Sequence, residues 1–180
     1  MSKPTSICVF CGSRTGNSPA YMELASRFGT LLAKRDIRLV YGGGNIGLMG
    51  AAARACADAG GQVLGIIPEF LCSREIAFTG CELDIVDTLH TRKARMAEQS
   101  DGFVVLPGGL GTLEEVVEVL SWINLKELQQ KVVLLDEDGY WDSFYQLLNF
   151  TINEGFTAPE VIEQAMRANT PEQAVQLLGV

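Results

Sequence analysis

The fold is decided by the stretch DGFVVLPGGLGTLEEVVEVL at residues 101–120. Gly102–Leu106 is a short apolar run, which is typical of a buried strand. The turn Pro107–Thr112 follows it directly, and the apolar residues after the turn recur at helical spacing. A buried strand that turns through glycines into an amphipathic helix is the repeating unit of a parallel sheet covered by helices.

The same alternation of short apolar runs and amphipathic stretches continues through the 180 residues. Besides Gly102–Leu106, the expected strands are Ser6–Phe10, Arg38–Tyr41, Val63–Ile67, Val132–Leu135 and, with a weaker pattern, Leu83–Val86. The expected helices are Pro19–Lys34, Leu48–Ala59, Thr91–Ser100, Thr112–Leu125 and Asp142–Glu154, then a short helix after Pro159 and a last one from near Pro171. We therefore predict one α/β domain over residues 1–180, a doubly wound, Rossmann-like parallel sheet with helices on both faces.

Three of the expected strands end in glycine-containing turns, at Cys11–Arg14, Gly42–Gly47 and Pro107–Thr112. Glycines let the backbone turn sharply and leave amide N–H groups open to an anion at the start of the next helix. Three such turns at one sheet edge favour a phosphate-binding site more strongly than one turn does. None contains the Gly-x-x-x-x-Gly-Lys-Ser/Thr pattern of an ATP-hydrolysing P-loop. Gly42–Gly47 also lacks the position and the acidic partner of a dinucleotide-binding turn.

Two acidic residues, Glu114 and Glu115, follow the third turn. They either complement the helix dipole or place a carboxylate where it acts on the sugar of a bound phosphate ester. Upstream, Arg92 and Lys93 begin the helix that precedes Gly102–Leu106. They are either solvated surface or hold a phosphate or a developing negative charge.

The helix after the third turn has two apolar strips. One strip is expected to face the sheet and consists of Leu113, Val116, Val117, Leu120 and Ile123. Val119 and Trp122 form a second strip on the expected outer face. Either a partner subunit or the C-terminal helices would cover that second strip.

The net charge of −8 arises from 14 basic and 22 acidic side chains. An acidic surface argues against broad contact with nucleic acid or an anionic membrane, because both need a basic footprint. It is compatible with a small anion held by backbone amides and one or two arginines. No apolar run approaches the roughly 18 residues of a membrane span. The N-terminal segment Met1–Thr5 is short and polar. We therefore expect a cytoplasmic protein with no membrane partner.

The five cysteines are an odd number without the spacing of a disulfide framework, so reduced thiols are expected. Cys8 and Cys11 would face opposite ways along a strand, and neither opens a helix, which disfavours a redox pair. His90 is the single histidine, and no cysteine cluster replaces a histidine site. We expect chemistry without a metal or an organic cofactor.

Two paired motifs carry a resemblance to a known family. Arg92-Lys93 is followed by Met96, and Pro107–Glu115 has the pattern Pro-Gly-Gly-x-Gly-Thr-x-x-Glu. Together they resemble the LONELY GUY (LOG) proteins, cytokinin riboside 5′-monophosphate phosphoribohydrolases that are often mislabelled lysine decarboxylases. The separation of Arg92 from Glu115 also looks the same as in that family. Similar segments extend along nearly the whole chain: Cys11–Ser13, Tyr41–Gly44, Gly47–Gly50, Gly65–Pro68, Arg74–Ile76, Gly139–Tyr140 and Glu154–Phe156.

The resemblance implies a Rossmann-like homodimer that hydrolyses the N-glycosidic bond of a nucleoside 5′-monophosphate to a free base and ribose 5-phosphate. The substrate would be a cytokinin riboside 5′-monophosphate, AMP or both. Arg92 and Glu115 take the catalytic positions. The implied substrate contacts are Ser13, Glu75, Arg92, Lys93, Gly108, Gly109, Gly111, Thr112, Glu114 and Ser121.

The chain departs from the family pattern at Thr91, where the family has Glu, at Arg14, where it has a second Ser, and at Val132, where it has Pro. The alternative function is a non-catalytic nucleotide-binding or molybdenum-cofactor carrier with the same fold and glycine turns. The complete Arg92 and Glu115 pair argues against that carrier. A lysine decarboxylase would need pyridoxal phosphate, and no lysine has a convincing Schiff-base context.

Overall fold

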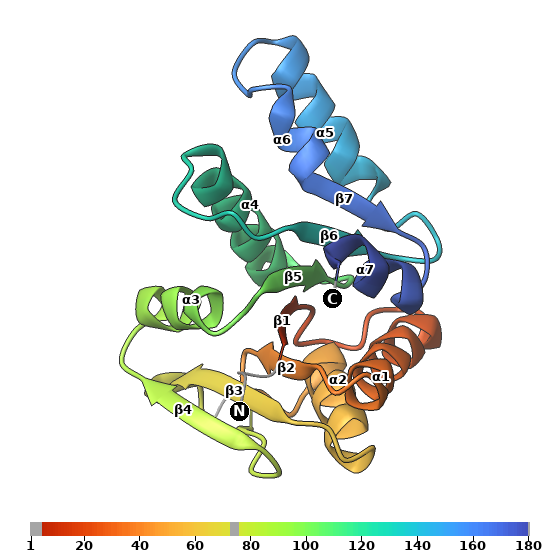
Figure 1. The fold of residues 1–180 in the computed structure, drawn as a ribbon, viewed down its shortest axis with the longest axis vertical. Coiled ribbons are helices and arrows are strands. Elements are labelled where there is room, and N and C mark those ends of the chain that lie inside the picture. The colour runs from red at the N-terminus through yellow and green to blue at the C-terminus, as the bar shows by residue number, and fades with distance from the viewer. Residues whose placement is uncertain (1–4, 73–75, 180) are drawn as a thin grey trace.

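Seven parallel strands form one sheet in the order β4-β3-β2-β1-β5-β6-β7 (Figure 1). The computed structural model describes residues 5–72 and 76–179. The strands are β1 (Ser6–Phe10), β2 (Arg38–Tyr41), β3 (Val63–Pro68), β4 (Glu82–Val86), β5 (Gly102–Val105), β6 (Val132–Leu135) and β7 (Ala165–Ala168). The helices are α1 (Pro19–Lys34), α2 (Gly47–Asp58), the short 3-10 turn η1 (Glu69–Leu71), α3 (Leu89–Glu98), α4 (Leu110–Asn124), α5 (Asp142–Asn153), α6 (Glu160–Gln164) and α7 (Pro171–Leu178).

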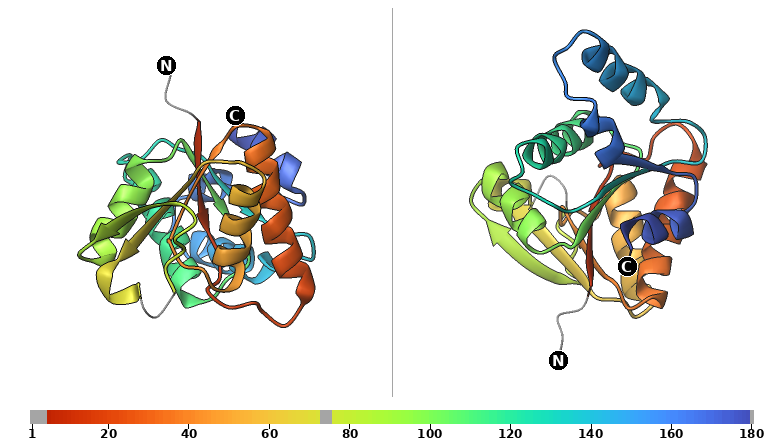
Figure 2. Two further views of the ribbon diagram at one scale, coloured as in Figure 1. Left: turned by 90° about the horizontal axis from the view of Figure 1, so that it is seen from below. Right: turned by 45° about the horizontal axis from the view of Figure 1, so that its top comes forward.

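Helices cover both faces of this sheet, which explains why its central strands are mostly apolar. Ile7 and Val9 of β1 pack with α1, α2 and α7, whereas Cys8 and Phe10 pack with α3, α4, α5 and α6. In the left view of Figure 2, the orange α1 and α2 lie on one side of the sheet and the green α3 and α4 on the other. The predicted fold class is confirmed.

The chain reverses its direction of winding between β1 and β5. β1 pairs with β2 on one side and with β5 on the other, both in parallel register. The loops after these two strands therefore lead to helices on opposite faces of the sheet and leave a crevice between them. Ligands of doubly wound sheets bind at such a switch point.

All six predicted strands are present, but β7 was missed. The region after Pro159 was expected to hold two helices, and both occur, as α6 and α7. The four residues between them, Ala165–Ala168, pair with β6 and complete the sheet. Alanine and methionine have little strand preference, so this strand exists because it adds an edge to β6 rather than because of its composition.

Most of the predicted core stripe of α4 is confirmed, because Val116 and Leu120 are buried and Leu113 and Ile123 pack against the same core, but the prediction was wrong at Val117. Val119 is 2% exposed and lies in the core with Val116 and Leu120, whereas Val117, expected to face the sheet, is 48% exposed. Trp122 packs partly buried against the same core. Because α4 is apolar around much of its circumference, spacing alone allows more than one buried stripe. Val119 and Trp122 therefore do not form an outer strip.

The cysteine prediction holds where the structure describes it. All five cysteines are free thiols. Cys8 and Cys11 lie in the cores on opposite faces of the sheet, as strand alternation predicts. Burial raises the pKa of Cys56 to about 11, which keeps this thiol protonated at neutral pH.

No helix in the described ranges, residues 5–72 and 76–179, combines the length and apolar character needed to cross a bilayer.

Candidate active site

A cavity of about 510 Å³ opens at the carboxyl ends of the central strands. Its walls come from the loops after β1 and β5, from Gly42 after β2, and from side chains of α1, α2, α3 and α4. The ionisable arginine and glutamate side chains in the lining are Arg14, Arg92 and Glu115. This is the position that the switch point between β1 and β5 predicts for a ligand.

The three glycine turns contact one another directly at this edge of the sheet. The Gly12 amide donates to the Pro107 carbonyl at 3.0 Å, and the Leu48 amide donates to the Gly12 carbonyl at 2.9 Å. Gly47 has a φ of +53°, and a Cβ added there would lie 2.4 Å from the carbonyl carbon of Ser13. The turns thus form one fixed backbone unit, and side chains at these glycines would separate it.

The glycines of the third turn differ in what surrounds them. A Cβ at Gly108 would lie 2.1 Å from Oγ1 of Thr112, so packing within the loop excludes a side chain there. At Gly109 and Gly111 an added Cβ would meet no atom within 4 Å, and both residues line the cavity. Packing within the described protein does not explain these two glycines. They leave the backbone at the start of α4 open to the cavity, as an anion-binding turn requires.

Arg92, on α3, is fixed deep in the cavity wall. Its side chain is buried, Nε donates to the Ile66 carbonyl at 3.1 Å, and Nη2 donates to the Gly42 carbonyl at 3.1 Å. A Cβ at Gly42 would lie 1.9 Å from that same Nη2 atom. The glycine after β2 therefore makes the space that the Arg92 guanidinium occupies.

Glu115, on the second turn of α4, is half-buried and lines the same cavity as Arg92. The charge of its carboxylate influences the pKa of the buried Cys8 thiol. Burial raises the pKa of the Cys8 thiol well above its usual range, and the negative charge of Glu115 raises it further. An acid and an arginine thus share one cavity with an open glycine turn.

The cavity lining includes several of the residues predicted from the sequence and leaves out others. Ser13, Arg92, Gly108, Gly109, Gly111, Thr112 and Glu115 all line it. Lys93, Glu114 and Ser121 do not belong to its lining within this chain. Glu75 lies outside the described residues.

Lys93 instead joins α3 to α4. Its ammonium group pairs with Glu114 and, at 2.9 Å, with Glu118. Burial lowers the pKa of Lys93, but the hydrogen bonds to these two carboxylates outweigh it and leave the pKa above its ordinary value. No lysine among the described residues lines the cavity.

Tyr140 is a cavity residue that the sequence analysis placed in a family-like segment but did not assign to the site. Its hydroxyl donates to the Gly108 carbonyl at 2.6 Å, and its ring meets Tyr21 edge-on with 5.7 Å between the centroids. The buried carboxylate of Asp136 accepts hydrogen bonds from the amides of Gly139, Tyr140 and Trp141 and so shapes the turn that carries Tyr140. Because this turn follows the predicted strand β6, its place at the carboxyl edge of the sheet could have identified Tyr140 as a site residue from the sequence.

Within residues 5–72 and 76–179, no group of three His, Cys, Asp or Glu side chains is arranged to hold a metal ion.

Comparison with curated proteins gives relatives that span almost the whole chain. Cytokinin riboside 5′-monophosphate phosphoribohydrolase LOG3 from Arabidopsis thaliana is 44% identical over 98% of this chain and 83% of its own length. Cytokinin riboside 5′-monophosphate phosphoribohydrolase LOG7 from the same plant is 44% identical over 96% of this chain and 80% of its own length.

Solved structures share the fold at lower identity. The molybdenum cofactor carrier protein from Chlamydomonas reinhardtii has a TM-score of 0.74 at 20% identity, covering 98% of this chain and 97% of its own. The molybdenum cofactor binding protein from Rippkaea orientalis has a TM-score of 0.72 at 24% identity, covering 99% of this chain and 98% of its own. These likenesses show the fold alone.

The family model described as "Possible lysine decarboxylase" matches residues 49–178, which include the Arg92 and Pro107–Glu115 motifs. Together with the similarity to the curated LOG proteins over almost the whole chain, this match shows that the chain belongs to the LOG family, whose members match the model described as "Possible lysine decarboxylase".

Proposed function

We propose that this protein hydrolyses the N-glycosidic bond of a nucleoside 5′-monophosphate, releasing a free base and ribose 5-phosphate. The substrate is a cytokinin riboside 5′-monophosphate, AMP or both. The observation that carries the proposal is the placement of Arg92 and Glu115 in one cavity beside the open Gly109 and Gly111 backbone. The curated relatives are named for this reaction on cytokinin riboside 5′-monophosphates.

The glycine turn at Pro107–Thr112 holds the 5′-phosphate in this proposal. Backbone amides at the start of α4 and the positive end of its helix dipole attract the anion. The N-cap residue of α4 is Gly109, which has no side chain to accept a hydrogen bond from the first amides of the helix, so an anion does not have to displace a cap at this position. Phosphate binding then supplies energy at a distance from the bond that breaks.

Glu115 and Arg92 act on the ribose and the base. As the bond between the anomeric carbon and the base breaks, its electron pair leaves on the base and positive charge develops on the ribose. The ionised Glu115 stabilises that charge and accepts a proton from the water whose oxygen bonds to the anomeric carbon. The departing base takes up a proton, and Arg92, fixed by two carbonyls, orients the substrate and stabilises negative charge on the base.

The proposal includes a homodimer formed through the outer face of α3, α4 and α5. Val119 and Trp122 do not support it, but other residues do. The exposed apolar side chains on these helices are Leu89, Leu110, Val117, Leu147 and Phe150. Apolar side chains grouped on one outer layer are typical of a protein interface.

A cytoplasmic location is also part of the proposal. It is supported by the five free thiols, since reducing compartments maintain cysteines in this state.

A product assay tests the proposed reaction. The purified protein is incubated with AMP, isopentenyl-AMP, GMP and CMP, with adenosine as the unphosphorylated control, and free base and ribose 5-phosphate are separated by chromatography. We expect equimolar base and ribose 5-phosphate from at least one purine monophosphate. Tight nucleotide binding without any base release would contradict hydrolysis and favour the carrier function.

A further inference from the structure

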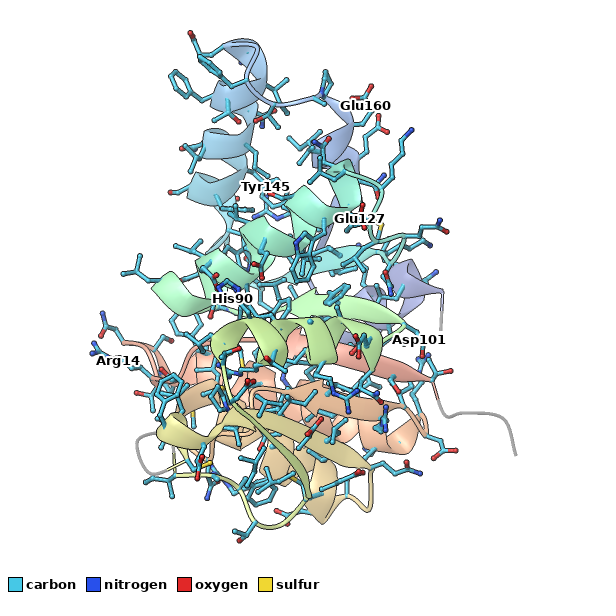
Figure 3. The ribbon with its side chains drawn as sticks, turned by 90° about the vertical axis from the view of Figure 1, so that its left-hand side faces the viewer. Arg14, His90, Asp101, Glu127, Tyr145 and Glu160 are labelled. Atoms are coloured by element: carbon cyan, nitrogen blue, oxygen red, sulfur yellow. The ribbon has the colours of Figure 1, made fainter. Side chains whose placement is uncertain are left out.

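Arg14 stands at the edge of the cavity, on the loop between β1 and α1. Arg14 is an exposed residue and belongs to the cavity lining. In Figure 3, Arg14 and His90 lie toward the left side of the molecule, whereas Asp101, which precedes β5, lies on the right side. Arg14 therefore extends from the sheet edge at which the glycine turns meet.

The main chain of Arg14 is held between the other two turns. A Cβ at Gly47 would lie 2.5 Å from the Arg14 nitrogen, so the two backbones are in direct contact. A Cβ at Gly12 would lie 3.3 Å from the Arg14 carbonyl oxygen and equally 3.3 Å from Cα of Gly108. The exposed side chain therefore starts from a fixed point beside the Gly108–Thr112 turn.

The charges in the cavity are divided unevenly. The guanidinium of Arg92 is engaged with the carbonyls of Ile66 and Gly42 in the buried wall. The guanidinium of Arg14 forms no hydrogen bond or ion pair with residues 5–72 or 76–179. All of its N–H donors are therefore available to a ligand, and a planar guanidinium binds two oxygens of a phosphate at once.

A phosphate in this cavity needs that positive charge. Glu115 brings a negative charge to the same lining, and a phosphate monoester carries close to two negative charges at neutral pH. Backbone amides and a helix dipole supply only partial charges. A full cation on the solvent side of the glycine turn offsets the repulsion between the phosphate and the carboxylate.

We propose that Arg14 binds the 5′-phosphate together with the Gly108–Thr112 turn and thereby sets the preference of this chain for phosphorylated over unphosphorylated nucleosides. This inference rests on the proposed function for the identity of the substrate. Arg14 is a specificity-determining residue that does not touch the bond that breaks. It acts equally on the bound substrate and on the transition state, so it lowers KM and leaves kcat almost unchanged.

The test compares Arg14→Gln with Arg35→Gln, which removes the same charge from the exposed C-terminal end of α1. We expect Arg14→Gln to raise KM for AMP roughly 10- to 100-fold with little change in kcat, because it removes charge-assisted hydrogen bonds. The inhibition constant of ribose 5-phosphate should rise by a similar factor. Activity on adenosine should stay as in the wild type, and Arg14→Lys should recover part of the lost affinity. Values for Arg14→Gln equal to those of Arg35→Gln would overturn the proposal.

A calorimetric titration with ribose 5-phosphate separates this inference from the proposed reaction, because binding needs no turnover. If the wild type binds ribose 5-phosphate but releases no base from any nucleotide, the hydrolysis falls while Arg14 is still judged by the affinity lost in Arg14→Gln. If the wild type releases base but Arg14→Gln binds ribose 5-phosphate unchanged, the role of Arg14 alone is overturned. If the wild type does not bind ribose 5-phosphate at all, the role of Arg14 is overturned, while the hydrolysis is still judged by base release.

Discussion

Gly42 and Gly111 illustrate two different reasons for a glycine in the same cavity wall. At Gly42 the nearest obstacle to a side chain is the guanidinium of Arg92, so this glycine serves the placement of another residue. At Gly111 an added Cβ meets nothing in the described protein. The second kind of glycine is informative about function, because the space it leaves is not used by the protein itself.

A Gly111→Ala substitution separates folding from ligand binding. Gly111 lies in the first turn of α4 and its φ is not in the left-handed region, so alanine fits the backbone and should keep or slightly raise the melting temperature. The added methyl group projects from the turn that is proposed to cradle the phosphate and should raise KM for AMP at least about tenfold, corresponding to about 1.4 kcal/mol. Thermal unfolding and steady-state kinetics of the same preparation check both parts. Unchanged KM in a well-folded variant would count against a phosphate at this turn.

At the residue scale, the sequence was enough to find the glycine turns, Arg92 and Glu115, because each stands in a motif of fixed spacing. It was not enough to assign Tyr140 to the site, since its contact with Gly108 depends on how β6 lies beside β5. The sequence placed Arg14 in the first glycine-containing turn and as a departure from the family pattern, but did not assign it to the site. That its guanidinium forms no hydrogen bond or ion pair with the described residues is visible only in the three-dimensional structure.

At the scale of elements, the strands of the sheet interior could be predicted because they are buried on both faces. β1 and β6 are buried at every position, so β6 and the residues of β1 after Ser6 form continuous apolar runs. β7 could not be predicted, because pairing with β6 stabilises it and its own residues have no strand pattern. Val117 and Val119 of α4 were assigned to the wrong faces for a related reason, since only the neighbouring helices and strands select which residues of an apolar helix are buried.

The ion pairs between α3 and α4 give a prediction about stability against pH. The pKa of Lys93 is raised by Glu114 and Glu118 in the folded state. Its contribution is therefore complete below the unfolded pKa of about 10.4 and is lost as the pH rises through the higher folded-state pKa.

A Lys93→Met variant tests this prediction by urea unfolding at pH 8 and pH 11. We expect the substitution to lower the free energy of unfolding by about 1–3 kcal/mol at pH 8, because a partly buried cation with two charged partners is removed. The difference between wild type and variant should shrink at pH 11. A difference that stays the same at both values would show that the charge of Lys93 is not what stabilises the contact.

At the scale of the whole molecule, α5 and α6 stand beyond the end of the sheet at β7, at the top of Figure 1. Leu147 and Phe150 of α5 are more than half exposed, at 57% and 61%. Val117 of α4 belongs to the same layer of helices. A single chain leaves these apolar side chains in water, and the proposed homodimer would bury them.

Sedimentation equilibrium at micromolar concentration checks the assembly. We expect the wild type to be a dimer and Val117→Asp to be largely monomeric, because a buried unpaired carboxylate opposes association. Val117 is half exposed in the single chain, so the variant should still fold, with its circular dichroism spectrum unchanged. A wild type that sediments only as a monomer would contradict the homodimer.

The central claim, that the Glu115 carboxylate and the glycine turn together break an N-glycosidic bond, is tested most directly by the turnover of Glu115→Gln. Glu127→Gln, an exposed substitution just past the opposite end of α4, is the matched control (Figure 3). The substrate is AMP or isopentenyl-AMP, whichever the wild type cleaves faster, and nucleotide binding is measured in parallel by calorimetry. The account predicts that Glu115→Gln binds the nucleotide but releases base about 100- to 10,000-fold more slowly, while Glu127→Gln matches the wild type. Base release by Glu115→Gln at the rate of Glu127→Gln would contradict it.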